Sequence, residues 1–346
     1  MSEHAAELAA ERSTHELVQR RGGRRRKGRD ESVMVPDATF TSYYGRPVLK
    51  ASPWEADIPA YLFLGGLAAG SSLLGAGAQL TGRPGLRRVG RLGALGAISV
   101  SFAALVHDLG RPSRFTNMLR MAKPTSPMSI GTWILTGYGP LAGLAGAAEL
   151  LDVLPLPKAA RGPARVVSAL APAAGLAAAA IAPAVASYTG VLLADTATPT
   201  WHGAYKELPF VFVGSAAAAA GGLGMALCDK AEAAPARRLA VAGAAFELAA
   251  SQRMTQSLGM AAEPLHQGAP GRMMRASKAL TVAGAAGSLL AGRSRLAGVV
   301  SGISLLAGSV LTRFGIFEAG QASARDPRYT VVPQRERIER GESAGA

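Results

Sequence analysis

Long segments without charged side chains are the feature that most restricts how this chain can fold. A helix that crosses the roughly 30 Å hydrocarbon core of a bilayer needs about 20 mostly apolar residues, because every backbone amide must find its hydrogen bond within the helix. Two segments, 57–80 and 239–252, carry a single carboxylate each. Six further segments carry no acidic or basic residue: 92–106, 128–148, 166–194, 208–228, 279–292 and 296–312. The sequence therefore predicts an all-α, polytopic membrane bundle of about eight transmembrane helices.

Two polar tails flank this predicted bundle. We predict a basic, flexible N-terminal tail at 1–53, the transmembrane bundle at 54–318 and a polar C-terminal tail at 319–346. The net charge of +14 comes partly from the basic run between Arg20 and Arg29. Such a run can bind nucleic acid, but before a first membrane span it more typically lies against anionic lipid. We therefore expect membrane lipid as a partner and no nucleic acid.

Cysteine and histidine limit the redox groups that the chain can hold. Cys228 is the only cysteine, which excludes an intramolecular disulfide and an iron–sulfur cluster held by this chain alone. The five histidines lie in the N-terminal tail, at predicted helix ends or in loops: His4, His15, His107, His202 and His266. No predicted span offers the facing pair of histidines that a transmembrane haem needs. We expect no haem, iron–sulfur cluster or metal site in this chain.

The connections between spans differ on the two sides of the membrane. With an even number of spans both tails lie on one side, here called the N-side. Aromatic and ionisable residues gather in the N-side connections, whereas the far-side connections are rich in Gly, Pro and Arg and predict turns. We therefore expect any chemistry on the N-side. The basic residues of the tails favour a cytoplasmic N-side and those of the short loops favour the opposite, so the orientation stays open.

Asp57 and Tyr61 lie one helical turn apart at the start of the first predicted span, so they share a face. A carboxylate and a phenol at this depth can hydrogen-bond the oxygen atoms of a quinone head group and take its proton. The alternative is that Asp57 only favours a helix N-terminus and Tyr61 only belongs to the interfacial aromatic belt. The sequence leaves both interpretations open.

The second predicted span ends in the run 107–112, His-Asp-Leu-Gly-Arg-Pro. Its glycine and proline are typical helix stops, and Arg111 and Arg114 can meet lipid phosphates. These roles do not explain the imidazole and the carboxylate at 107 and 108. A His–Asp pair at a membrane boundary can transfer protons near neutral pH, which gives these two residues a functional interpretation. In the loop that follows, Ser126 is predicted to cap the third span.

A third cluster flanks the connection between the fourth and fifth predicted spans: Tyr188, Asp195, Trp201, His202 and Glu207. Its composition is typical of an interfacial loop. Glu247 differs, because it lies about half-way through the sixth predicted span. A carboxylate at this depth is costly and usually faces the bundle interior. Glu247 is therefore a candidate either for a proton pathway or for a structural hydrogen bond to a Ser, Thr or Gln on another helix.

Four short passages, taken in order, resemble the NrfD/PsrC family of membrane subunits of polysulfide, nitrite and related molybdopterin or multihaem reductase complexes. They are 61–70 (YLFLGGLAAG), 107–112 (HDLGRP) with 114–120, 123–129 (KPTSPMS) leading to Trp133, and 188–193 (YTGVLL) with Pro199 and Trp201. The similarity runs from about residue 54 to about residue 333, which is most of the chain. It implies an eight-helix bundle without haem, in agreement with the positions of the histidines.

The resemblance implies that the chain binds an exchangeable menaquinone or ubiquinone at one face of a plasma or inner membrane. It also implies exchange of two electrons with a ferredoxin-like 4Fe-4S subunit, which relays them to or from a molybdopterin or multihaem catalytic subunit. This chain would then not be catalytic alone. In the polysulfide reductase branch, a polar residue and a His one turn later in the first helix contact the quinone. Asp57 and Tyr61 take these positions here, so the chemistry departs from that branch.

We therefore predict a quinol- or quinone-binding subunit of an oxidoreductase complex. The residues predicted to bind the quinone and transfer its protons are Asp57, Tyr61, His107 and Asp108. The residues predicted to dock the iron–sulfur partner are Arg111, Arg114, Lys123 and Ser126. Two alternatives stay open: a proton or ion pathway protein without a redox role, lined by Glu247 and Asp57, and a passive membrane anchor of a reductase complex.

Overall fold

The computed structural model describes residues 47–339 except 110, 112, 114 and 156. Most of the predicted basic tail, Arg114 and residues 340–346 of the predicted C-terminal tail therefore lie outside the described residues. Every regular element within the described part is helical.

Eight long helices make up the bundle: α2 (Asp57–Leu80), α3 (Pro84–Asp108), α5 (Pro127–Leu151), α6 (Arg161–Ala194), α8 (Leu208–Leu227), α9 (Ala234–Ser257), α10 (Gly268–Leu290) and α11 (Arg295–Arg325). Each of the eight predicted segments lies on one of these helices, in the predicted order. Short elements occupy the connections and the C-terminal end: α4 (Phe115–Met118), η2 (Lys158–Ala160), α7 (Pro199–Gly203), η3 (Gly259–Leu265) and α12 (Arg328–Glu339).

Six of the long helices are long and apolar enough to cross a membrane, namely α2, α3, α5, α6, α8 and α11. The chain is thus a polytopic helical membrane protein, as predicted. Helices α9 and α10 have the length of a span but carry too many polar residues to meet the same criterion. For these two helices, a transmembrane position stays a prediction.

Most of the long helices extend further than the segments from which they were predicted. Pro84 lies in the first turn of α3, where a proline fits because its missing N–H would be unpaired, so the helix starts among the arginines of a predicted turn. At the other end of the chain, α11 continues to Arg325, beyond the predicted boundary at residue 318. Gln321 in this extension is buried, and its Nε2 donates to the backbone oxygens of Ser52 (3.0 Å) and Trp54 (3.2 Å). The end of α11 thereby fixes the segment that leads into α2.

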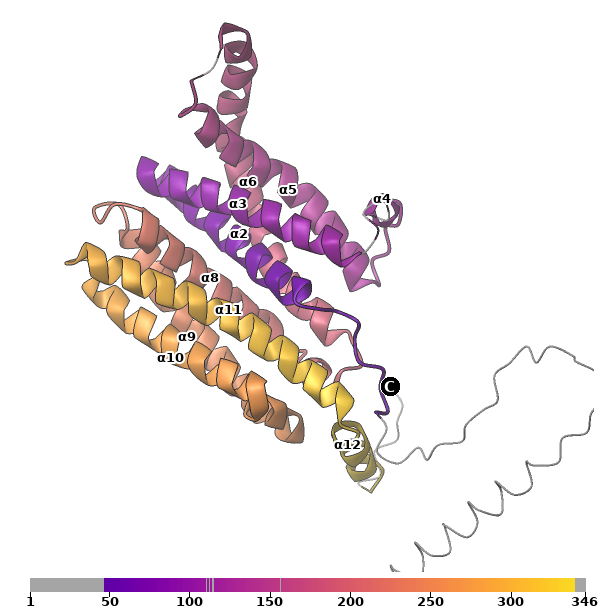
Figure 1. Cartoon of the computed structure of the whole chain (residues 1–346). Helices are drawn as coiled ribbons and strands as arrows, with labels where there is room; N and C mark the ends of the chain where they lie inside the picture. Colours follow the sequence, from indigo (N-terminus) through magenta and orange to yellow (C-terminus); the bar gives the residue numbers. More distant parts are fainter. Residues whose placement is uncertain (1–46, 110, 112, 114, 156, 340–346) are drawn as a thin grey trace, which may run out of the picture. The chain divides into compact units, whose positions relative to one another are not determined.

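The long helices pack mainly as neighbours in sequence, α2 with α3, α5 with α6, α8 with α9 and α10 with α11 (Figure 1). Helix α2 is buried along most of its length and also packs on α6 and α8. Glycine permits a close approach of α2 to α8, since a Cβ atom on Gly70 would lie 2.6 Å from the backbone oxygen of Ala216 in α8. Ser72 and Tyr138 join α2 to α5 through a buried hydrogen bond of 2.8 Å between their hydroxyl groups.

Candidate functional site

The N-side end of the bundle, where α2 begins and α3 ends, joins the first two predicted clusters. Asp57 is the first residue of α2 and His107 lies in the last turn of α3. His107 Nδ1 lies 2.7 Å from Asp57 Oδ2. Because an ionised carboxylate can only accept, Nδ1 carries the hydrogen of this bond. The imidazole is 82% exposed, so its Nε2 is available to a second partner.

The carboxylate that His107 bonds is therefore that of Asp57 and not that of its neighbour Asp108. Successive residues of a helix point about 100° apart, so adjacent side chains on α3 do not face each other. Asp108 is half-buried at the end of the same helix. The pairing joins residues 50 apart in the sequence, and only the packing of α2 on α3 reveals it.

Tyr61 lies one turn further along α2 and is buried in the core, with 1% of its surface exposed. Its backbone oxygen accepts from Ser101 Oγ at 3.2 Å, which ties α2 to α3. Its hydroxyl is buried and has no hydrogen-bond partner among the described residues. This burial does not fit an exposed aromatic belt. A buried phenol without an acceptor costs about 1–3 kcal/mol, so the position favours a ligand or a water molecule as partner.

Trp201 of the third cluster is a packing residue that positions the segment before Asp57. It is fully buried, and its indole Nε1 donates to the backbone oxygen of Ile316 in α11 at 2.8 Å. Its ring lies between those of Trp54 and Phe317, with centroid distances of 6.1 and 5.4 Å. Helix α7 and the end of α11 thus form an aromatic support directly next to the start of α2.

The other members of the third cluster divide between core and surface. Tyr188 is buried, and its ring lies so close to Gly131 of α5 that a side chain at that glycine would overlap it. Asp195 and His202 are exposed, and His202 Nδ1 bonds the backbone oxygen of Ala194 at 3.0 Å. Within the described residues, no hydrogen bond links this cluster to Asp57 or His107.

The connection between α3 and α5 carries the residues predicted to dock a partner. Arg111 and Lys123 are exposed, and Arg114 lies outside the described residues. Ser126 occupies the N-cap position of α5, but its side chain makes no capping hydrogen bond, which corrects the predicted cap. Ser129 orders the loop instead, because its hydroxyl accepts from the backbone N–H of Lys123 and donates to the backbone oxygen of Met121, both at 2.9 Å.

Glu247 lies near the middle of α9 and is 3% exposed. Its Oε1 accepts from Thr312 Oγ1 of α11 at 2.7 Å, which is the structural hydrogen bond that one sequence interpretation predicted. Its Oε2 is buried and lacks a hydrogen-bond partner in the described part of the chain. A role of Glu247 in a proton pathway stays a prediction at this point.

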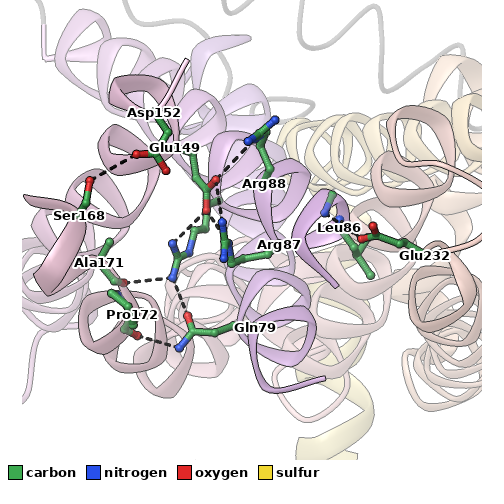
Figure 2. A network of polar contacts seen from close by, with 12 residues as sticks. Gln79, Leu86, Arg87, Arg88, Glu149, Asp152, Ser168, Ala171, Pro172 and Glu232 are labelled. Carbon is green, nitrogen blue, oxygen red and sulfur yellow. Dashed lines mark hydrogen bonds and ion pairs between the residues drawn. The ribbon is translucent and has the colours of Figure 1, made fainter. Parts of the chain in front are cut away.

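A polar network at the far side was not predicted from the sequence. Glu149 of α5 is 1% exposed and lies among three arginines of α3, 2.7 Å from Arg87, 3.6 Å from Arg88 and 3.0 Å from Arg91 (Figure 2). Arg91 Nη2 also donates to Gln79 Oε1 of α2 at 2.5 Å and to the backbone of α6. In the sequence, Glu149 directly follows the uncharged segment 128–148. The three arginines lie before segment 92–106, in the far-side connection that was predicted to be a turn.

A second unpredicted cluster lies where the C-terminal helix α12 meets η3. The Tyr329 hydroxyl donates to Glu263 Oε2 at 3.1 Å, and Arg328 lies 3.1 Å from the same oxygen. Burial and the hydrogen bond to Glu263 raise the pKa of Tyr329 above its ordinary value. Part of the predicted C-terminal tail is thus a helix that packs on the bundle.

Comparison with known families covers the part of the chain that holds the Asp57–His107 pair. The family model described as Polysulphide reductase, NrfD, matches residues 48–248, which is more than half of the chain. The match contains α2 to α8 and α9 as far as residue 248, and it ends before η3, α10, α11 and α12. No curated protein matches the chain. The matched range shows that this chain belongs to the NrfD family of multi-pass membrane subunits of reductase complexes.

Proposed function

We propose that the chain is the quinol- or quinone-binding subunit of a reductase complex and exchanges electrons between the membrane quinone pool and a ferredoxin-like iron–sulfur subunit. The observation that carries this proposal is the Asp57–His107 pair, 2.7 Å apart, with the unpaired hydroxyl of Tyr61 one turn deeper in α2. Membership of the NrfD family supports the reductase complex. The position at helix ends supports a ligand that arrives from the membrane.

The residues present fit a quinone head group. Such a head group is a flat ring with oxygen atoms at opposite ends, and it supplies the two-electron, two-proton chemistry when bound. The buried Tyr61 hydroxyl is a donor that lacks an acceptor, and the exposed imidazole of His107 offers a second polar contact.

His107 is the residue that exchanges the proton in this proposal. Its Nδ1–H is held by Asp57, so Nε2 is the free acceptor of the neutral imidazole. When Nε2 takes a proton, the carboxylate of Asp57 stabilises the resulting imidazolium. Asp57 therefore fixes both the tautomer and the orientation of the ring. Asp108, half-buried beside His107 in the sequence, adds negative charge to the same helix end.

The iron–sulfur partner is proposed to dock over the connection that follows His107. Arg111 and Lys123 are exposed there, with Ser126 at the start of α5, and they offer positive charge and hydrogen-bond donors. Positive surface charge steers an acidic protein and speeds its association. The catalytic subunit, of molybdopterin or multihaem type, would receive or supply electrons through that partner. The complex is proposed to lie in the plasma or inner membrane.

Substitution of the pair tests the proposal. Asp57→Asn and His107→Ala are each expected to lower quinol-dependent electron transfer by about 10²-fold or more, because a positioned acid–base group contributes about 10²–10⁴-fold. Assembly with the partner subunits should survive, since both residues lie at an exposed helix end. His202→Ala is the matched control, because that histidine is also exposed on the N-side but bonds only a backbone oxygen. Unchanged turnover in both variants would contradict the proposal.

Binding of the head group itself is tested by Tyr61→Phe, which removes only the buried hydroxyl. We expect weaker binding of a quinone analogue to the purified complex, by about ten-fold, the effect of one lost hydrogen bond. The control is Tyr188→Phe, which changes a buried tyrosine that packs on Gly131. If the complex binds no quinone analogue at all, a passive anchor becomes the better description.

A further inference from the structure

A cavity of about 430 Å³, lined largely by polar residues, lies between α9, α10, α11 and η3, away from Asp57 and His107. The buried part of its lining holds one carboxyl and three hydroxyl groups: Glu247, Ser277, Thr281 and Thr312. The exposed part holds amide and basic side chains: Gln252, Gln256, His266, Arg275 and Lys278. Most of this cavity belongs to the C-terminal part of the chain, beyond the family match.

Glu247 stands at the buried end of this cavity with half of its carboxyl group unsatisfied. Oε1 accepts from Thr312 Oγ1 at 2.7 Å, and that hydroxyl lies 2.6 Å from Ser277 Oγ, so one oxygen belongs to a hydroxyl network. Oε2 is buried and has no hydrogen-bond partner among the described residues. A buried carboxyl group is costly unless its second oxygen is protonated or bonded by water. The cavity offers the room for either.

The buried charge that acts on Glu247 is that of Arg313, but the two residues make no ion pair among the described residues. On α11, the fully buried Arg313 turns to α8, where its Nη2 donates to the backbone oxygen of Phe212 at 2.8 Å and its guanidinium lies 3.7 Å from that ring. Arg275 and Lys278 of α10 and His266 after η3 lie at the exposed end of the cavity. Helix α8 faces Glu247 with Gly214, which carries no side chain, and with the hydroxyl group of Ser215, whose Oγ lies 2.8 Å from Ser309 Oγ. Within the described residues, Glu247 makes no ion pair.

The cavity leads from the N-side into the bundle. Helix α9 ends on the N-side and α10 begins there, and the exposed lining residues lie in the last turns of α9, after η3 and in the first half of α10. Glu247, Ser251 and Thr255 follow at intervals of four residues, so one stripe of α9 faces the cavity from its buried to its exposed end. Polar residues of both α9 and α10 line the cavity, and they contribute to the lower apolar character of these two helices.

We propose that this cavity is a water-filled inlet through which Glu247 exchanges a proton with the N-side. At about 30 Å³ for each water molecule, the volume suffices for on the order of ten. The proton passes from cavity water to Oε2 of Glu247 and returns by the same route, while the Thr312 hydroxyl holds Oε1. The basic side chains at the exposed end repel metal cations, whereas a proton moves by exchange between water molecules. The inlet does not depend on quinone binding.

Cysteine accessibility tests the water in the inlet. With the native cysteine replaced (Cys228→Ser), Ser251→Cys and Thr255→Cys place thiols on the cavity stripe of α9. The controls Ala245→Cys and Ala249→Cys place them on exposed positions of other faces of the same helix. In native membranes, a charged, water-soluble thiol reagent should modify the cavity positions at least about ten-fold faster than the controls, since rates follow thiol access. Equal rates at cavity and control positions would overturn the inlet.

Carbodiimide labelling tests the proton on Glu247. Hydrophobic carbodiimides react with protonated carboxyl groups, so labelling of Glu247, mapped by mass spectrometry, should decrease as the pH on the N-side is raised. Ser251→Leu fills the inlet and should slow this pH response several-fold without changing the response of Glu263 outside the cavity lining. Labelling of Glu247 that is independent of pH, or protection by sodium ions at constant pH, would overturn the proposal.

Discussion

The two ends of the α2–α3 pair carry ion pairs of opposite character. On the N-side, Asp57 and His107 bond each other at helix ends, with the imidazole 82% exposed. On the far side, Glu149 is 1% exposed and lies among three arginines, and Arg91 in turn bonds groups on α2 and α6 (Figure 2). The far-side network gives the buried Glu149 and Arg91 hydrogen-bond partners and connects four helices. The N-side pair connects two helix ends and leaves a reactive nitrogen available, which suits chemistry rather than assembly.

The largest effect on stability is expected from Glu149→Ala. Removal of the carboxylate leaves Arg91, which is 7% exposed, as a buried cation without its partner. Loss of one member of a buried ion pair costs about 3–5 kcal/mol. The free energy of unfolding of the purified chain in mixed micelles, measured by denaturant titration, should decrease by this amount.

Arg88→Ala is the matched control for that network. Arg88 is half-exposed and lies 3.6 Å from Glu149, so its removal should cost at most about 1 kcal/mol. The double variant Arg91→Met/Glu149→Leu should recover most of the stability, because apolar side chains replace a buried pair at little cost. A large decrease in the free energy of unfolding for Arg88→Ala, or no decrease for Glu149→Ala, would contradict a stabilising role of the far-side network and with it the difference between the two ends.

A smaller effect is expected from Tyr138→Phe, which keeps the ring and removes one hydroxyl between the two ends. Ser72 then loses its hydrogen-bond partner at a fully buried position, which costs about 1–3 kcal/mol. The same denaturant titration measures this loss. Ser72→Ala in the Tyr138→Phe background should restore part of it, since no buried hydroxyl is then left without a partner. No restoration would mean that packing, not the hydrogen bond, matters at this position.

The comparison also shows how much of the fold the sequence predicts. Segments with at most one charged residue predicted every long helix, because the absence of water in the bilayer imposes the same requirement on each of them. They did not predict helix ends, because Pro84 and the arginines after it form helix as readily as a turn. They also did not predict that α11 continues to Arg325, because Gln321 pairs with backbone oxygens more than 260 residues earlier in the chain.

The candidate site was predictable in its members but not in its pairings. Asp57 and Tyr61 share a face because helical spacing alone requires it. The bond between His107 and Asp57 depends on the register between α2 and α3, which no local pattern encodes. The far-side network was missed for the same reason, since Arg91, Glu149 and Gln79 come from three helices. Buried polar groups find partners across helices, so their identity follows from packing.

On the N-side, Asp57→Asn should separate activity from stability. The imidazole of His107 is exposed and Asp57 is half-buried, so solvent screens their Coulomb attraction and its loss should leave the thermal stability of the assembled complex unchanged within error. Quinol-dependent turnover should decrease, as proposed above. The measurement is a thermal unfolding curve recorded on the same preparation as the activity. A substantial loss of stability would make the two ends alike and would remove the distinction drawn between them.

The smallest effect concerns Cys228, which follows α8 at the far side and is 2% exposed. Burial, together with the charges of Glu232 and Asp229, raises the pKa of this thiol above its ordinary value. The folded protein therefore favours the thiol. The resulting contribution to the free energy of unfolding is fully present below the ordinary pKa and is lost as the pH rises through the raised pKa.

Alkylation of the native protein near neutral pH should be much slower than alkylation of the denatured chain and should accelerate only at higher pH, because the thiolate is the reactive form. Mass spectrometry of the intact protein after timed alkylation measures the rate. Rapid modification at neutral pH would show that the far side is open to water, which would contradict the closed, hydrogen-bonded character that distinguishes it from the N-side.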